Sequence, residues 1–508
     1  MIALRFWLLS LLGAGLLLLI APPGHAQSAG PGPFDEHADV GAVEAAGSAQ
    51  YDAEAQVLRL EGGGAGLGGR ADSVHVAWRK VGGDVILRAR GDLLGEGASA
   101  QRTMGWTIRA DRSPDAAHVS AVVRGDGLAA LRYRPTAGAP TEARAASRNG
   151  PNVLQLARSG DTFTMSVARF GNTFTRQQVS GVALGDSVYV GLFVAAGAAG
   201  ATETAEFRNV RIVTPASDAL TEYEEYLGSR VETMTVESGH RTVVHREPRS
   251  LQAPNWTLDG RALIYNSEGR LYRFDLATGT PEQIDTGFAD NLNNDHVLSF
   301  DGATLGISHG AEEADGASIV YTVPVEGGMP TRVTPKGPSY LHGWSPDGDW
   351  LTYTGARGGD YDLYKIPAEG GAEVRLTSAP GLDDGSEYGP DGEHIYFNSV
   401  RSGSMEIWRM RPDGRRKEQL TDDRLNNWFP HVSPDGESIV FLSYRPRVAP
   451  GDHPFYKQVY LRRMPAEGGD PEVIAYLYGG QGTINVPSWS PDGERIAFVS
   501  NTGAATLE

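Results

Sequence analysis

The stretch VPSWSPDGERIAFVS, from Val486 to Ser500, alternates apolar and polar residues on both sides of a Ser-Pro-Asp-Gly turn. Alternation with a period of two is typical of a half-buried strand, and Asp-Gly favours the positive backbone angles of a tight hairpin. The stretch therefore predicts two short antiparallel strands. A hairpin of this kind is too small to be stable alone and normally belongs to a larger sheet.

Five further stretches of the second half repeat this pattern. Their glycines and that of the first stretch are spaced by 42, 46, 44, 44 and 57 residues, at Gly260, Gly302, Gly348, Gly392, Gly436 and Gly493. A second hairpin module, such as VPVEGGMPTRVT or IPAEGGAEVRLT, lies between them. A period in the forties with two hairpins per repeat is typical of four-stranded propeller blades. The last repeat lacks its second hairpin, and we expect Val231–Glu247 to supply it and so to close a ring of six blades.

The front of the chain differs in composition. Residues 34–213 are rich in Gly and Ala and contain alternating segments such as VHVAWRK and DVILRAR, which predict a β-sandwich. Residues 214–230 predict a linker helix, because Ser217 or Asp218 can cap its start and Gly228 can end it. The expected fold class is all-β: a sandwich (34–213), a linker helix (214–230) and a six-bladed propeller (231–508).

Residues 1–26 carry a targeting signal. Arg5 precedes an apolar run from Phe6 to Ile20, and Ala26 ends a small-residue cleavage motif, as in a secretory signal peptide. The alternative, a membrane anchor, would need a longer apolar run. With no cysteine and a net charge of -18, the chain excludes disulfides and disfavours nucleic acid and anionic membranes as partners. We expect a periplasmic or extracellular protein that does not insert into the membrane after signal cleavage.

The PxWSPDGxxIxF pattern of the repeats resembles the TolB-like, WD40-like (PD40) β-propeller family. The segments HADVG, DSVHVAWRKVGGD, LARSGDTFT and FRNVRIV resemble the concanavalin A-like jelly rolls of secreted carbohydrate-active proteins. These resemblances imply a fold more than a function, because such propellers serve as scaffolds, lyases and peptidase gates alike.

The loops opposite the Asp-Gly turns are long and individual, so we expect function at that end of the propeller. One residue per blade, five positions before the turn serine, should ring the mouth of the central channel. These residues are Gln252, Asn294, Tyr340, Asp384, Trp428 and Asn485. Amides, a carboxylate and aromatic rings suit a sugar. The alternative is that they cap loops.

Two positions further along, His296 and His342 occupy equivalent places in adjacent blades. With His431 and Gln481 they form a candidate site for a divalent metal, Ca or Mn, and this set resembles that of the oligogalacturonate lyases. The alternative is that these side chains pack or form hydrogen bonds.

Candidate groups for acid–base chemistry lie in the same loops. Asp384 and Glu387 are the carboxylates, and the insertion that contains His453 and Tyr456 could form a lid with either residue as a base. Arg445 could neutralise a uronate.

The leading hypothesis is an exported propeller protein that recognises a polysaccharide or oligosaccharide and acts on it as a lyase or hydrolase. The alternative is a TolB-like cell-envelope scaffold that binds a protein or peptide. Whether the chain is an enzyme stays open, because the sequence contains no recognisable catalytic motif.

Overall fold

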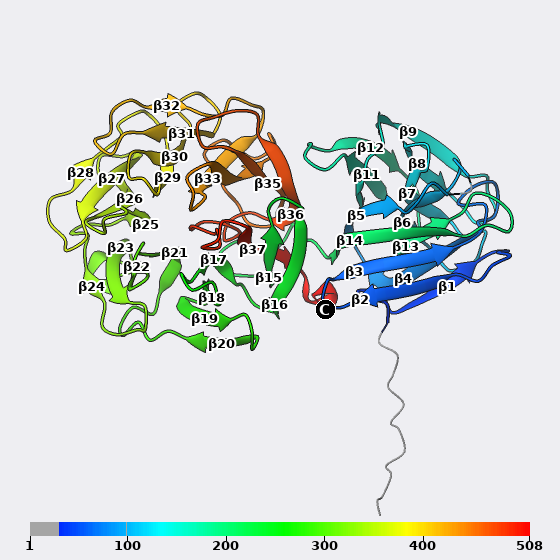
Figure 1. The fold of residues 1–508 in the computed structure, drawn as a ribbon, viewed down its shortest axis with the longest axis horizontal. Coiled ribbons are helices and arrows are strands. Elements are labelled where there is room, and N and C mark those ends of the chain that lie inside the picture. Colours follow the sequence, from blue (N-terminus) through cyan, green and yellow to red (C-terminus); the bar gives the residue numbers. More distant parts are fainter. Residues whose placement is uncertain (1–29, 98, 508) are drawn as a thin grey trace, which may run out of the picture.

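A computed structural model describes residues 30–97 and 99–507 of the chain (Figure 1). Strands dominate it, joined by two 3-10 helices, η1 (Glu312–Ala314) and η2 (Ala504–Thr506). The predicted signal peptide lies outside the described residues. Within those residues no helix has the length and apolar character needed to cross a membrane.

The front part of the chain forms two antiparallel sheets of seven strands each. In order, the first sheet contains β1 (Glu36–Val40), β4 (Val74–Gly82), β13 (Ser187–Ala195), β6 (Thr103–Arg109), β7 (His118–Arg124), β8 (Leu128–Arg134) and β9 (Glu142–Asn149). The second contains β12 (Thr175–Ser180), β11 (Thr162–Ala168), β10 (Val153–Ser159), β5 (Val85–Leu93), β14 (Glu203–Val213), β3 (Val57–Gly62) and β2 (Ser48–Asp52). Leu58 and Leu87 of one sheet and Trp106 and Leu192 of the other share a buried apolar cluster, so the sheets face each other as a sandwich.

The second part forms six small sheets around a common axis, on the left of Figure 1, and confirms the predicted six-bladed propeller. Five sheets have four strands, and the first strand of each lies nearest the axis in Figure 1. The first blade contains β17 (Gln252–Trp256), β18 (Ala262–Ser267), β19 (Arg270–Asp275) and β20 (Thr280–Gln283), and the second contains β21 (Leu292–Leu298), β22 (Thr304–Gly310), β23 (Ser318–Pro324) and β24 (Thr331–Arg332). The third contains β25 (Ser339–Trp344), β26 (Trp350–Ala356), β27 (Tyr361–Pro367) and β28 (Val374–Arg375), and the fourth contains β29 (Asp383–Tyr388), β30 (Ile395–Ser399), β31 (Glu406–Met410) and β32 (Glu418–Gln419). The fifth contains β33 (Asn426–Val432), β34 (Ser438–Tyr444), β35 (Lys457–Pro465) and β36 (Glu472–Gly479).

The sixth sheet combines strands from both ends of the propeller sequence. β15 (Gly228–Thr235) lies between β16 (His240–Glu247) and β37 (Arg495–Thr502). The pairing with β37 is antiparallel and continuous, from Gly228 opposite Thr502 to Thr235 opposite Arg495. The outer edge of the last strand of the chain is therefore covered by a hairpin from the front of the propeller.

The hairpin predicted over Val486–Ser500 is only half formed. Its second strand is β37, but its first strand is reduced to a single bridge between Trp489 and Ile496. Pro487 has no backbone N–H to give to a ladder. The loop still covers this edge of β37, because the Ser488 carbonyl accepts a hydrogen bond from Ala497 at 2.8 Å.

The predicted linker helix is wrong. The segment between β14 and β15 contains turns instead of a helix. Glu225 N donates to the Thr221 carbonyl at 2.9 Å, but the Glu225 carboxylate then accepts from Thr221 N at 2.9 Å and closes the turn on itself. Tyr223 has a φ of 68°, a left-handed conformation that cannot continue a right-handed helix.

The Asp-Gly turns form the end of the propeller that we call the turn end. In each of five blades the turn aspartate accepts a hydrogen bond from the Ser or Thr hydroxyl two residues before it, as Asp435 does from Ser433 at 2.5 Å. The Ser433 oxygen also accepts from Ser438 N at 3.0 Å. One motif thus closes the same turn in each of these blades.

The innermost strands bulge at the opposite end, the mouth. In five of these strands the pairing register shifts around the predicted mouth residue or within a residue of it, for example between Asp384 and Glu387 and between Trp428 and His431. A bulge inserts a residue and changes the face to which the following side chains point. A strict alternation of side chains between the two faces of a strand therefore cannot predict where the side chains of this region point.

The sandwich and the propeller meet at a buried junction. Gly171 of the sandwich forms a β-bridge with Val473 of β36, and Gln155 Nε2 donates to Gln458 Oε1 of β35 at 3.1 Å. Arg88, which is buried, donates to the Tyr476 carbonyl at 2.6 Å. These contacts fix the sandwich against the fifth blade.

Candidate functional site

Two of the predicted mouth residues contact each other across blades. Asn294 Nδ2 donates to Gln252 Oε1 at 2.9 Å, and Gln252 Nε2 donates to Ser250 Oγ at 2.9 Å. Asn485 instead holds its own loop, since its side chain donates to Gln481 Oε1 and accepts from Gly482 N, both at 2.8 Å. The equal spacing in sequence brings these residues to one region, but their hydrogen bonds differ from blade to blade.

A cluster of charged side chains lies next to these amides. His342 Nε2 is 3.0 Å from Asp384 Oδ1, and Thr354 Oγ1 donates to the same oxygen at 2.7 Å. Burial alone would raise the pKa of Asp384, but the charge and hydrogen bond of His342 lower it to about 2. Burial likewise opposes protonation of His342, yet Asp384 and Asp295 outweigh it and raise the pKa of the imidazole.

Asp295 is the acid of this cluster with the opposite shift. It is buried, and Asn293 Nδ2 donates to its carboxylate at 2.8 Å. Burial, with the nearby charge of Asp384, raises the pKa of Asp295 to about 6. The same carboxylates act on Tyr340. Burial, Tyr361 and the charges of Asp295 and Asp384 raise the pKa of its hydroxyl to about 12. The cluster can take up a proton on mild acidification, and its charge then changes.

Trp428 was predicted to present its ring at the mouth, and the structure contradicts this. The side chain is fully buried, with its ring centroid 4.5 Å from that of His453 in an edge-on contact. Phe429, at the bulge, has a φ of 53° and belongs to the same buried cluster. The bulge turns Trp428 into the blade, so it cannot stack on a sugar. His453 packs on these rings as well, and its Nδ1 has no hydrogen-bond partner among the described residues.

The predicted metal ligands do not converge. His296 Nε2 is 3.2 Å from the Ile264 carbonyl, and His342 faces Asp384. His431 uses both ring nitrogens, at 2.7 Å from Glu387 Oε2 and 2.6 Å from the Ile484 carbonyl. Each imidazole contacts a different partner, so these contacts do not support the histidine metal site, which stays a prediction. Glu387 is likewise engaged by His431.

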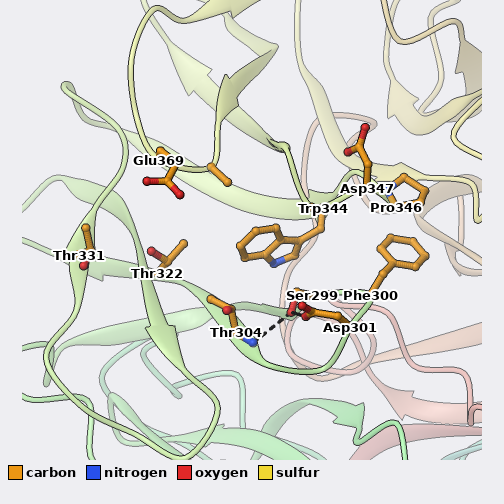
Figure 2. A pocket seen from close by; sticks show the side chains of 12 residues that line it. Ser299, Phe300, Asp301, Thr304, Thr322, Thr331, Trp344, Pro346, Asp347 and Glu369 are labelled. Atoms are coloured by element: carbon orange, nitrogen blue, oxygen red, sulfur yellow. Dashed lines mark hydrogen bonds between the residues drawn. The ribbon is translucent and has the colours of Figure 1, made fainter.

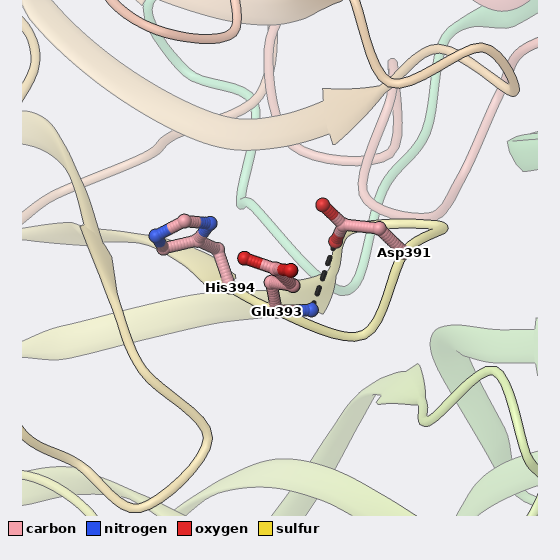
Figure 3. Close-up of side chains that lie close together, drawn as sticks. All are labelled: Asp391, Glu393 and His394. Atoms are coloured by element: carbon pink, nitrogen blue, oxygen red, sulfur yellow. Dashed lines mark hydrogen bonds between the residues drawn. The ribbon is translucent and has the colours of Figure 1, made fainter.

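The described residues contain one group of three side chains close enough together to hold a cation, Asp391, Glu393 and His394 (Figure 3). It lies at the turn end, away from the predicted histidines. Asp391 Oδ1 accepts from Glu393 N at 2.8 Å as part of the turn, and Glu393 pairs with Arg411 at 2.9 Å. These contacts explain the cluster as a turn with a surface ion pair.

Tyr456 of the predicted lid and Arg445, the predicted partner of a uronate, lie on the sandwich side of the propeller. Tyr456 is buried, and its hydroxyl accepts a hydrogen bond from Leu227 N at 3.0 Å. Arg445 lies over the ring of Tyr460, 5.8 Å from its centroid, and burial lowers its pKa to about 10. Tyr460 itself accepts from Phe174 N of the sandwich at 3.3 Å. Neither Tyr456 nor Arg445 is thus positioned over the mouth.

A cavity of about 490 Å³ opens beside the mouth amides. Its lining includes the amides Gln252, Asn294 and Gln481 and the linker tyrosines Tyr223 and Tyr226. The tyrosines are 60% and 40% exposed. Both pack edge-on against Phe455, which also lines the cavity.

Tyr223 and Tyr226 were not among the predicted site residues, because their segment was assigned to a helix that only joins the two parts. The available signal was two aromatic residues in an otherwise acidic stretch, TEYEEYL. Aromatic rings that stay partly exposed beside amides are typical of binding surfaces.

A second hollow, of about 400 Å³, lies at the turn end between the second and third blades (Figure 2). At most turns a side chain of one blade packs on the turn glycine of the next, as Leu258 does within 2.7 Å of the Cβ position of Gly302. Gly348 has no such neighbour within 4 Å, and Phe300 of the preceding blade lines the hollow instead. Trp344 forms part of its wall in Figure 2.

Part of the chain is similar to known proteins. Residues 342–449 match the TolB β-propeller domain (PD40). An uncharacterised protein of Agrobacterium fabrum is 47% identical over 272 residues, 53% of this chain and 92% of that protein. A solved structure from Agrobacterium tumefaciens, named as a candidate TolB, is 45% identical with a TM-score of 0.53, over 55% of this chain and all of that one. TolB from Acinetobacter baumannii is 16% identical with a TM-score of 0.40, over 65% of this chain and 80% of that one.

Proposed function

Because this chain belongs to the TolB β-propeller family, we propose that it is a cell-envelope scaffold that binds a protein or peptide partner at the mouth of its propeller. The observation that carries the proposal is the cavity of about 490 Å³ beside the mouth, which amides from two blades and two exposed tyrosines line together. Amide side chains can pair with the N–H and C=O groups of an extended peptide, and tyrosines supply contact area at small entropic cost.

The acid–base groups near the mouth support a binding role more than a catalytic one. Asp384 is held by His342 and Thr354, and Glu387 is held by His431. A glycosidase needs two carboxylates free to act on one bond. Groups already paired with each other favour a site that is rigid and preorganised for binding.

Recognition of a glycan is the second candidate, because amides and exposed tyrosines also suit sugar hydroxyls and C–H faces. Its support is weaker since Trp428, the ring predicted to stack on a sugar, is buried. Cleavage of a glycan has no further support, and the two candidates are separated by the experiment below.

The proposal includes an exported protein of the periplasm or cell surface, consistent with the net charge of -18 and the absence of cysteine. It also includes a sandwich of the concanavalin type at residues 34–213 and a propeller at 231–508 whose ring the β15–β16 hairpin closes. The pairing of β15 with β37 supports this closure, because it leaves no open edge there.

The test is a photo-crosslinking residue at Tyr223 in the whole chain, expressed in a Gram-negative envelope. Leu258, which is 50% exposed at the turn end, carries the same group in the control. We expect the Tyr223 position to capture one defined envelope protein. The purified partner should then lose about tenfold or more in affinity with Tyr223→Ala and Asn294→Ala, since hot-spot residues contribute about 2 kcal/mol or more.

Two outcomes would contradict the scaffold. Equal capture from the Leu258 position would remove the mouth from the interaction. Saturable binding of an oligosaccharide, abolished by Tyr223→Ala, would transfer the site to glycan recognition.

A further inference from the structure

A small basic cavity lies at the junction of the sandwich and the propeller, away from the mouth. Its volume is about 170 Å³, several times the ~30 Å³ that one water molecule occupies in the liquid. Arginines from both parts of the chain converge on it, Arg79 and Arg211 from the sandwich and Arg230 and Arg246 from the β15–β16 hairpin. Tyr51 adds a hydroxyl to the lining. In a chain of net charge -18, such a group of four arginines calls for a counter-charge.

Two of these arginines have buried nitrogen atoms without hydrogen-bond partners. Arg230 is 4% exposed and Arg211 is 7% exposed. Arg230 donates to the carbonyls of Ile212 and Thr506 through Nη2, and its Nη1 has no partner among the described residues. Arg211 Nε also has no hydrogen-bond partner among the described residues. Buried guanidinium donors are seldom left unpaired, because the cost of removing them from water is then not recovered.

The carboxylate at the centre of the junction does not balance these charges. Glu232 is fully buried and accepts from Arg211 at 2.6 Å and from Arg241 at 2.6 Å. Burial opposes its ionisation, but the two arginines hold the pKa of Glu232 well below its ordinary value. Its single negative charge is therefore already shared by two guanidinium groups.

Arg230, Arg246 and Arg79 have no ion pair with a carboxylate in the described part of the chain. Arg79 donates to the Ala505 carbonyl at 3.1 Å, which adds a dipole and no charge. Burial lowers the pKa of Arg230 to about 9, and Arg211, Arg246 and Arg241 contribute in the same direction. The cavity therefore carries positive charge that no carboxylate among the described residues neutralises.

We propose that this cavity is a binding site for a tetrahedral oxyanion, either a free phosphate ion or the phosphoryl group of a small molecule. Guanidinium groups match the oxygen geometry of phosphate and can each donate two hydrogen bonds. Arg230 and Arg211 supply the buried donors. Arg246 is exposed and lies at the rim, where an anion would enter the cavity. An anion bound here contacts β14 of the sandwich and β15 of the propeller together and holds the two parts in one arrangement.

The test measures thermal unfolding of the whole chain against increasing inorganic phosphate, with sodium chloride at equal ionic strength as the reference. A ligand that binds only the folded state raises the Tm in a saturable way. We expect such a rise with phosphate beyond that seen with chloride. Arg246→Gln should weaken the apparent affinity for phosphate about tenfold, which corresponds to about 1.4 kcal/mol of binding free energy.

Arg270→Gln is the matched control. Arg270 is a partly exposed arginine of the propeller that pairs with Asp290 and does not line the cavity. Arg230→Gln should abolish the phosphate effect if it folds, and Arg246→Gln keeps the test valid if it does not. Glycerol 3-phosphate, tested in parallel, identifies the source: tighter binding than phosphate assigns a phosphorylated molecule, and equal or weaker binding assigns the free ion.

The proposal fails if phosphate raises the Tm of the wild type no more than chloride does. It also fails if the rise is the same in Arg246→Gln as in the wild type. Neither result affects the mouth, because the two sites share no lining residue.

Discussion

At the turn end of the propeller, five of the six blades hold an aspartate in the same way, whereas at the mouth the six equivalent residues make different contacts. Ser433 and Asp435 illustrate the turn end, since the same hydroxyl-to-carboxylate bond recurs in four other blades. At the mouth, Asn294 reaches across to Gln252, whereas Trp428 is buried in its own blade.

The difference follows from the range of the interactions. The contacts of a turn join residues within five positions of each other, so a local motif is enough to define them. Several contacts of the mouth join different blades, and a bulge in each of five inner strands changes the direction of the side chains. The turn end therefore repeats, and the mouth becomes individual.

The largest effect should come from breaking the charged cluster at the mouth. Asp384→Asn leaves buried His342 without its carboxylate, and we expect a loss of about 3 kcal/mol in the free energy of unfolding at pH 6. Urea denaturation measures it. Asp413→Asn, the same change at an exposed carboxylate of another hairpin turn, should change stability by less than about 0.5 kcal/mol. Similar losses of unfolding free energy in both variants would mean that Asp384 contributes no more to stability than an exposed carboxylate does.

Asp295 should give a smaller effect of opposite sign. Its folded-state pKa is about 6, above its ordinary value of 3.8, so the folded protein binds the extra proton between these pH values. Stability from this group is full below pH 4 and is lost as the pH rises through 6. The raised pKa of His342 acts in the same direction, and the lowered pKa of Asp384 removes stability only on further acidification toward pH 2.

We therefore expect Asp295→Asn to stabilise the protein by about 2 kcal/mol at pH 7.5. The gain should fall to well under about 1 kcal/mol at pH 4, where the wild-type carboxyl is neutral in the folded state and only about half ionised in the unfolded state. Thermal unfolding at the two pH values is the measurement. A gain that is equal at both values would point to packing and not to the charge of Asp295.

The smallest effect should come from the turn end, and it should be uniform. Ser345→Ala, Ser433→Ala and Ser490→Ala each remove one hydroxyl that bonds the turn aspartate, at a cost of about 1 kcal/mol. Three equal values from urea denaturation would sharpen the contrast with the mouth. A spread wider than about 1 kcal/mol would show that the blades also differ at their regular end.

Much of the fold could be predicted from the sequence, but the individual contacts of the site could not. The spacing of the Asp-Gly turns gave six blades, and the unpaired last hairpin pointed to the Val231–Glu247 strands. The prediction that Trp428 points into the mouth was wrong, because counting back along an alternating strand does not detect the bulge between Trp428 and His431. The linker helix failed at Tyr223, whose left-handed backbone no propensity argument anticipates.

The sequence by itself determined the repeat, its turns and the absence of thiol chemistry, since each depends on residue type and on neighbours a few positions away. Only the tertiary structure decided which polar groups meet. Gln252 lies beside Asn294, His342 beside Asp384, and Arg230 beside Arg211, all brought together from separate elements. The physical reason is that the pairing of β15 with β37 and the packing of the sandwich on the propeller place distant strands in contact, and the electrostatics of the buried groups depend on those contacts.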